Sequence, residues 1–153
     1  MSAVTADDPT LTIARLCRVL ECNTTAGLTL PQYRVLGLLA GGDERASLLA
    51  SRVSVAKPTL TSIVDSLFDR GLVSRETPDG DRRSVRVSIT PAGRTELRKA
   101  AAEFRGVLDE VLMACDKPEA VLDALSTVRQ ALDDRWAQRV AAEQLLSVAG
   151  DRS

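Results

Sequence analysis

Residues 45 to 93 carry a pattern that few folds can accommodate, because signals for two short helices are followed at once by signals for two strands. In the second helix, apolar residues recur at the spacing of one helical face: Leu60, Ile63, Val64 and Leu67. The opposite face is short and polar, with Lys57, Thr61, Ser62 and Ser66. Gly71 suits the end of that helix, and residues 72–77 and 84–90 have the composition of strands. This order predicts a helix-turn-helix, with residues 46–53 as its first helix, followed by a β-hairpin.

The loop of the predicted hairpin is rich in turn-forming residues and ends in two cations. Residues 78–81 (Pro, Asp, Gly, Asp) favour a turn, and Arg82 and Arg83 follow directly. A helix with short polar side chains fits the major groove of duplex DNA, and a thin cationic hairpin can reach phosphates or an adjacent minor groove. The stretch therefore favours binding of double-stranded DNA.

The distribution of charge agrees with this interpretation. Residues 45–99 hold 11 Lys and Arg against 6 Asp and Glu, a net charge of +5. The rest of the chain holds 9 against 15, a net charge of −6, so the whole chain is close to neutral at −1. A basic central segment thus lies between acidic flanks, and the overall charge does not argue against a nucleic acid partner.

Composition argues against most catalytic and metal-binding classes. The 153-residue chain has no histidine, which is the commonest general base and metal ligand, and its 3% aromatic content is low for a protein that stacks on single strands. Cys17, Cys22 and Cys115 form no CxxC pair, the N-terminus does not resemble a signal peptide, and no apolar run could span a bilayer. We therefore expect a cytoplasmic, non-enzymatic protein without cofactor, metal or membrane.

Helices are predicted on both sides of the central stretch. Residues 10–21 suit a short helix, and Thr29 with Gln32 forms a capping box at the start of the next one. Pro91 and Pro118 open two long helices with apolar seams, the first through Leu97, Ala101, Phe104, Leu108 and Val111, the second through Val121, Leu125, Val128, Leu132 and Trp136. These helices exceed what a small DNA-binding lobe needs, so we expect them to pack against a second copy.

Three segments resemble one known family. Residues 28–40 (LTLPQYRVLGLLA), 58–76 (PTLTSIVDSLFDRGLVSRE) and 81–93 (DRRSVRVSITPAG) are similar to the MarR/SlyA family of bacterial winged-helix transcription regulators. The last segment matches the family's wing signature through Asp81, Arg83, Ile89, Thr90 and Gly93. The resemblance implies a mainly α, α+β winged-helix fold, with a tail and dimerisation helix in residues 1–27, a DNA-binding lobe in 28–93 and dimerisation helices in 94–149.

By the same resemblance, the protein is a homodimer on a pseudo-palindromic operator, most often a repressor, released by a small molecule bound between the dimer and DNA-binding lobes. Residues 57–70 would form the recognition helix, Asp65 would pair with Arg83 as a wing clamp, and Arg82 would enter the minor groove. The full set of expected DNA contacts is Lys57, Pro58, Thr59, Thr61, Ser62, Ser66, Arg75, Arg82, Arg83 and Arg86.

The chain also departs from the family pattern. Ala56 stands where the recognition helix usually has a Ser N-cap, Ser54 stands where Gly is common, and the first helix is short. Cys17, Cys22 and Tyr33 form a candidate effector or redox site, although small cysteines in helices usually serve packing. Two alternatives stay open here, a winged-helix dimer that binds proteins instead of DNA, and a thiol-based peroxide sensor of the same family.

Overall fold

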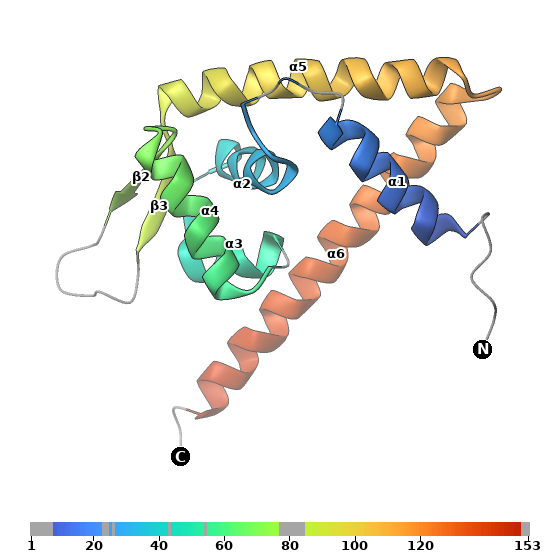
Figure 1. Cartoon of the computed structure of the whole chain (residues 1–153). Coiled ribbons are helices and arrows are strands. Elements are labelled where there is room, and N and C mark those ends of the chain that lie inside the picture. The colour runs from blue at the N-terminus through green and yellow to red at the C-terminus, as the bar shows by residue number, and fades with distance from the viewer. Residues whose placement is uncertain are drawn as a thin grey trace. The chain divides into compact units, whose positions relative to one another are not determined.

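The computed structural model of the chain describes residues 8–22, 25, 27–42, 44–53, 55–76 and 85–150, without the side chains of residues 44, 45, 47 and 143–150. These residues form six helices and three short strands. They belong to two compact units, residues 1–111 and residues 112–153. Figure 1 shows the helices and strands, coloured by residue number.

Helix α2 (Leu30–Ala40) begins with the predicted capping box. The backbone N–H of Gln32 donates to Oγ1 of Thr29 over 3.4 Å, and the N–H of Thr29 donates to Oε1 of Gln32 over 3.0 Å. Both bonds use backbone donors that the first helical turn would otherwise leave unsatisfied. The helix ends at Ala40, with Gly41 as its C-cap residue.

Helices α3 (Ala46–Val53) and α4 (Lys57–Asp69) form the predicted helix-turn-helix. They contact each other, and α2 contacts both (Figure 1). Pro58 lies in the first turn of α4, where a missing N–H costs nothing, but the N-cap residue Ala56 provides no side-chain hydrogen bond. Gly71 follows α4 with a φ of 68°, a left-handed conformation that glycine adopts without strain.

Strands β2 (Val73–Glu76) and β3 (Arg86–Ile89) are the predicted hairpin strands, paired antiparallel with Arg75 opposite Val87 and Glu76 opposite Arg86. A third strand, β1 (Glu44–Arg45), pairs with the other edge of β3 and gives the sheet order β1-β3-β2. We did not predict β1, because two residues are too few to show the alternation that identifies a strand.

Helix α5 (Pro91–Met113) starts directly after β3. Thr90 caps it, since its Oγ1 accepts from the N–H of Gly93 over 3.0 Å while donating to the carbonyl of Gly71 over 2.7 Å. A Cβ on Gly93 would lie only 2.0 Å from the carbonyl oxygen of Leu72. The Thr and Gly of the wing signature therefore join the start of α5 to the end of α4, a structural role away from the hairpin tip.

One apolar core holds α2, α3, α4, the sheet and part of α5 together. Its fully enclosed side chains include Val35, Leu36, Leu39, Leu49, Val53, Leu67 and Val87. On α5 the buried apolar residues are Ala100, Phe104, Val107 and Leu112, so Phe104 is the one member of the predicted seam that is buried. Leu97, Ala101 and Leu108 are half-buried and Val111 is exposed.

The remaining helices leave apolar side chains uncovered. Helix α1 (Pro9–Cys22) buries no residue fully, although Leu20 packs against the core. Helix α6 (Pro118–Gly150) exposes four of the predicted seam residues: Val121, Leu125, Val128 and Leu132. None of the helices in the described part of the chain combines the length and apolar character needed to cross a bilayer.

Candidate nucleic-acid interface

The N-terminal half of α4 presents a small polar surface to solvent. Its exposed residues are Lys57, Pro58, Thr59, Thr61 and Ser62, while Leu60 and Val64 on the other face are buried in the core. Because Ala56 lacks a capping side chain, the first backbone N–H groups and the positive end of the helix dipole are open to a ligand. Such a helix end suits a DNA phosphate, and the short side chains beside it suit the major groove.

Ser66 does not share this surface, contrary to the prediction that placed it among the polar face of the helix. It is half-buried, and its Oγ accepts a hydrogen bond of 3.1 Å from Nε2 of Gln32. Gln32 therefore completes the capping box of α2 with one end of its amide and holds α4 with the other. The helical periodicity missed this bond because Ser66 faces α2, an element distant in sequence.

Arg75 points from β2 to α4. Its Nη2 donates to Oδ1 of Asp65, and its guanidinium carbon lies 5.1 Å from the ring centroid of Phe68. Asp65 thus has a partner on β2 within the described residues, whereas the partner expected for it, Arg83, lies outside them together with Arg82. The Asp65–Arg83 clamp and the minor-groove role of Arg82 stay predictions.

Several other arginines of the chain serve internal contacts. Arg34 donates to the carbonyl of Val53 over 2.7 Å, and Arg94 donates to that of Ala40 over 3.3 Å, so each satisfies the C-terminal end of a neighbouring helix. Arg70 donates to the carbonyl of Gly27 over 2.7 Å and lies 3.8 Å from Glu96.

Two cations of the basic segment differ from these arginines. Lys57 on α4 and Arg86 on β3 are both exposed, and neither side chain has a partner among the residues that the structure describes. They are therefore two cations of the basic segment that remain available to phosphates.

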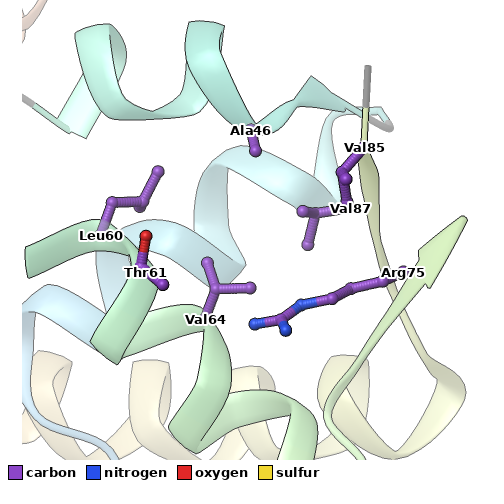
Figure 2. Close-up of a pocket in the computed structure, with 7 residues that line it drawn as sticks. All are labelled: Ala46, Leu60, Thr61, Val64, Arg75, Val85 and Val87. Atoms are coloured by element: carbon purple, nitrogen blue, oxygen red, sulfur yellow. The ribbon is translucent and has the colours of Figure 1, made fainter. Parts of the chain in front are cut away.

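A pocket of about 230 Å³ lies between α4 and the sheet. Its lining consists of Ala46, Leu60, Thr61, Val64, Arg75, Val85 and Val87. Figure 2 shows the Arg75 side chain extending from β2 towards Val64. Thr61 lies near Val64 on the same helix, α4. The lining is mostly apolar and joins the helix to both strands of the hairpin, so the contents of this pocket would affect how α4 and the hairpin fit together.

The structure does not bring the candidate effector or redox residues into a shared contact. Cys17 and Cys22 are exposed free thiols on α1. Tyr33 on α2 is half-buried and stacks against Phe104 of α5, with ring centroids 4.9 Å apart at 58°. That stacking gives Tyr33 a role in packing, and the effector or redox role of the three residues stays a prediction.

Sequence reasoning missed two residues that shape this surface, Phe68 and Gln32. Phe68 is 46% exposed on α4 and contacts the guanidinium of Arg75. One signal was available, because an aromatic residue three positions after Asp65 on a predicted recognition helix is unusual for a solvated face. For Gln32, the sequence pattern explains only the capping-box bond of its side chain. It gives no signal for the second bond, from Nε2 of Gln32 to Oγ of Ser66.

Comparison with known proteins gives a consistent result. The family model described as MarR family matches residues 26–84 of the chain. An uncharacterized HTH-type transcriptional regulator of Mycobacterium leprae is 35% identical over 134 residues, a match that covers 84% of this chain and 93% of the relative.

Solved structures share the fold. The transcriptional regulator BldR from Sulfolobus solfataricus has a TM-score of 0.65 at 28% identity, covering 84% of this chain and 99% of that one. A MarR-family transcriptional regulator from Rhodococcus sp. RHA1 has a TM-score of 0.73 at 21% identity, covering 86% of this chain and 96% of that one.

Proposed function

Since the chain belongs to the MarR family of HTH-type transcriptional regulators, which are DNA-binding proteins and not enzymes, we propose that it is a homodimeric repressor acting on chromosomal DNA in the cytoplasm. Each protomer places α4 in the major groove of one half of a pseudo-palindromic operator. Arg82, on the wing, reaches the adjacent minor groove. A small-molecule effector lowers the affinity for the operator.

The observation that carries this proposal is the exposed N-terminal face of α4. It combines an uncapped helix end with Lys57, Thr61 and Ser62, while the buried side of the same helix is anchored in the core by Leu60, Val64 and Leu67. A rigidly held helix with a donor-rich exposed face is what reading of base edges and phosphates requires. Arg86 on β3 adds an exposed cation on the neighbouring hairpin.

Uncovered apolar surface supports the homodimer. Leu125, Val128 and Leu132 on α6 are 41%, 52% and 60% exposed, and Ile13 on α1 is 61% exposed. Apolar residues repeated along helices in this way mark surfaces that associate. Two copies would place two recognition helices on one DNA face, roughly 34 Å apart, one turn of B-DNA.

An effector would act by shifting a population of conformations. It lowers operator affinity only to the degree that it prefers a dimer whose recognition helices do not match one turn of DNA. Each tenfold loss of affinity requires about 1.4 kcal/mol of that preference.

The proposal is tested with duplexes that the wild-type protein selects from a randomised pool. Fluorescence anisotropy should give tighter binding to a selected duplex than to a scrambled one of the same composition, and the logarithm of the binding constant should fall steeply with the logarithm of salt concentration. Replacing both Arg82 and Arg83 by Gln should weaken binding to the selected duplex and to the scrambled one. No selectable sequence, and binding indifferent to these arginines, would point instead to a winged-helix dimer that binds proteins.

A further inference from the structure

The contact between α4 and β2 contains three side chains that act together. Asp65 and Phe68 lie three residues apart on α4, so they share one face of the helix. The guanidinium of Arg75 meets both, through an ion pair with Asp65 and through a cation–π contact with the Phe68 ring at 5.1 Å. We call this set of three residues the α4–β2 bridge.

Arg75 could instead serve as a phosphate contact, as its residue type and its place on the hairpin suggest. The charges around it argue against that role. Its guanidinium is already paired with a carboxylate that is 49% exposed on the recognition helix itself. A free carboxylate in that position would repel DNA, so its presence is best explained by the arginine that it holds.

The contact at Arg75 bears on more than one side chain, because β2 and β3 are paired in one antiparallel ladder. Arg75 pairs in register with Val87, and its neighbour Glu76 pairs with Arg86. Fixing Arg75 on α4 therefore also fixes the position of Arg86 relative to the recognition helix. Arg75 lines the pocket between α4 and the sheet, and Figure 2 shows its guanidinium end directed towards Val64.

We propose that the α4–β2 bridge is a positioning device that sets the orientation of the hairpin against the recognition helix, and that Arg75 takes no part in phosphate binding. Arg86, one strand away and without a partner among the described residues, is the phosphate contact of this pair. The inference rests on the proposed function, since it needs an operator that both α4 and the hairpin touch.

The test compares anisotropy titrations of Arg75→Gln, Asp65→Asn and Arg86→Gln over a salt series, with a wild-type-selected duplex and a scrambled one. Arg75→Gln and Asp65→Asn should each weaken binding to the selected duplex about tenfold, because both release the hairpin in both protomers of a dimer. Neither variant should change the salt slope, which is the slope of the logarithm of the binding constant against the logarithm of salt concentration. Arg86→Gln should reduce the slope by about 0.9 per protomer for both duplexes, because it removes a phosphate contact.

Asp65→Asn is the most informative variant, because electrostatics alone predicts the opposite result. If Asp65 merely repelled phosphates, its neutralisation would tighten binding to both duplexes. The double variant Asp65→Asn/Arg75→Gln should bind no worse than either single variant, since the two residues act through one contact. Asp65→Glu, which keeps the carboxylate, should recover most of the lost affinity.

NMR gives a signature that does not depend on DNA. In the free protein, the side-chain protons of Arg75 should be shifted upfield by the ring of Phe68. Phe68→Leu should abolish this shift, and Asp65→Asn should reduce it, while backbone amide spectra confirm that each variant is folded.

Failure of the inference and failure of the proposed function are distinguishable. If the wild-type protein selects a duplex but Arg75→Gln lowers the salt slope as Arg86→Gln does, or if Asp65→Asn tightens binding, the positioning role is wrong and Arg75 is a phosphate contact. If the wild-type protein selects no duplex, the proposed function is wrong and this inference falls with it.

Discussion

At Gly93 the packing of the chain leaves no room for a side chain. A Cβ there would lie 2.0 Å from the backbone carbonyl oxygen of Leu72 and 2.9 Å from Cγ1 of Ile89. Because the nearest atom belongs to the backbone, no rotamer change can relieve the overlap. The residue is required by the junction of β3 and α5, and its place in the wing signature follows from that junction.

We expect Gly93→Ala to destabilise the protein by about 3 kcal/mol, as overpacking against backbone does. Urea denaturation at fixed protein concentration measures this loss. Gly106→Ala is the matched control on the same helix, where a Cβ would meet no atom within 4 Å. That variant should gain about 0.5–1 kcal/mol, since alanine favours a helix interior over glycine. Equal effects at both positions would contradict the packing that we describe.

Ser66 and Ser62 on the same helix should behave differently. Ser66→Ala removes the acceptor of the bond from Gln32 and should cost about 1 kcal/mol of stability, with an unchanged dependence of DNA binding on salt. Ser62→Ala, on the exposed face, should leave the urea midpoint unchanged and weaken binding to a selected duplex. The interpretation would be wrong if Ser66→Ala weakened DNA binding without loss of stability.

At the scale of elements, α2 and α4 begin in different ways. A complete capping box opens α2, whereas α4 starts at Ala56 with no side-chain bond. The helix that we assign to DNA reading is thus the one whose first turn is left open. Directly before α1, the carboxylate of Asp8 accepts from the side chain and the backbone of Thr10, which lowers the pKa of Asp8.

Ala56→Ser should add the missing cap and stabilise the free protein by about 1 kcal/mol. The backbone at Ala56, with φ of −62° and ψ of 147°, already has the extended conformation of a capping residue, so no rearrangement is needed. A rise in the urea midpoint checks this, with Ala56→Val as a control that adds bulk without an acceptor. A similar rise for Ala56→Val would mean that capping is not the cause.

At the scale of the whole molecule, apolar surface and charge are distributed unevenly. The long helix α6 leaves Leu125 and Leu132 exposed seven residues apart on one face. The basic segment 45–99 carries +5, against −6 for the rest of the chain. An association of two copies through the terminal helices would bury the exposed apolar residues of α6. It would also present two basic segments to the DNA, one from each copy.

Leu125→Asp/Leu132→Asp should therefore weaken self-association at least about a hundredfold, because it places carboxylates in an apolar interface. Analytical ultracentrifugation measures the change, and affinity for a selected duplex should fall with it. Gln130→Asp/Gln138→Asp introduces the same charge at two polar, exposed positions of α6 and should leave association unchanged. A wild-type protein that sediments as a monomer at micromolar concentration would contradict the homodimer.

The sequence by itself determined the order and bounds of the main elements, because their signals are local. Helical spacing in α4, the capping box of α2, and Gly71 at the turn depend only on residues a few positions apart. The family resemblance in residues 28–93 has the same basis. These features needed no knowledge of how the chain packs.

The tertiary structure alone decided which side chains are free to bind. Ser66 lies on the polar side of α4 by spacing, but it is bonded to Gln32 of α2. Arg75 has the residue type of a phosphate contact, but Asp65 and Phe68 of α4 engage its guanidinium. Strand β1 exists only because β3 offers it an edge. A count of charges records how many cations a segment has, whereas packing determines which of them are engaged by other side chains, and Lys57 and Arg86 are among those without a partner in the described residues.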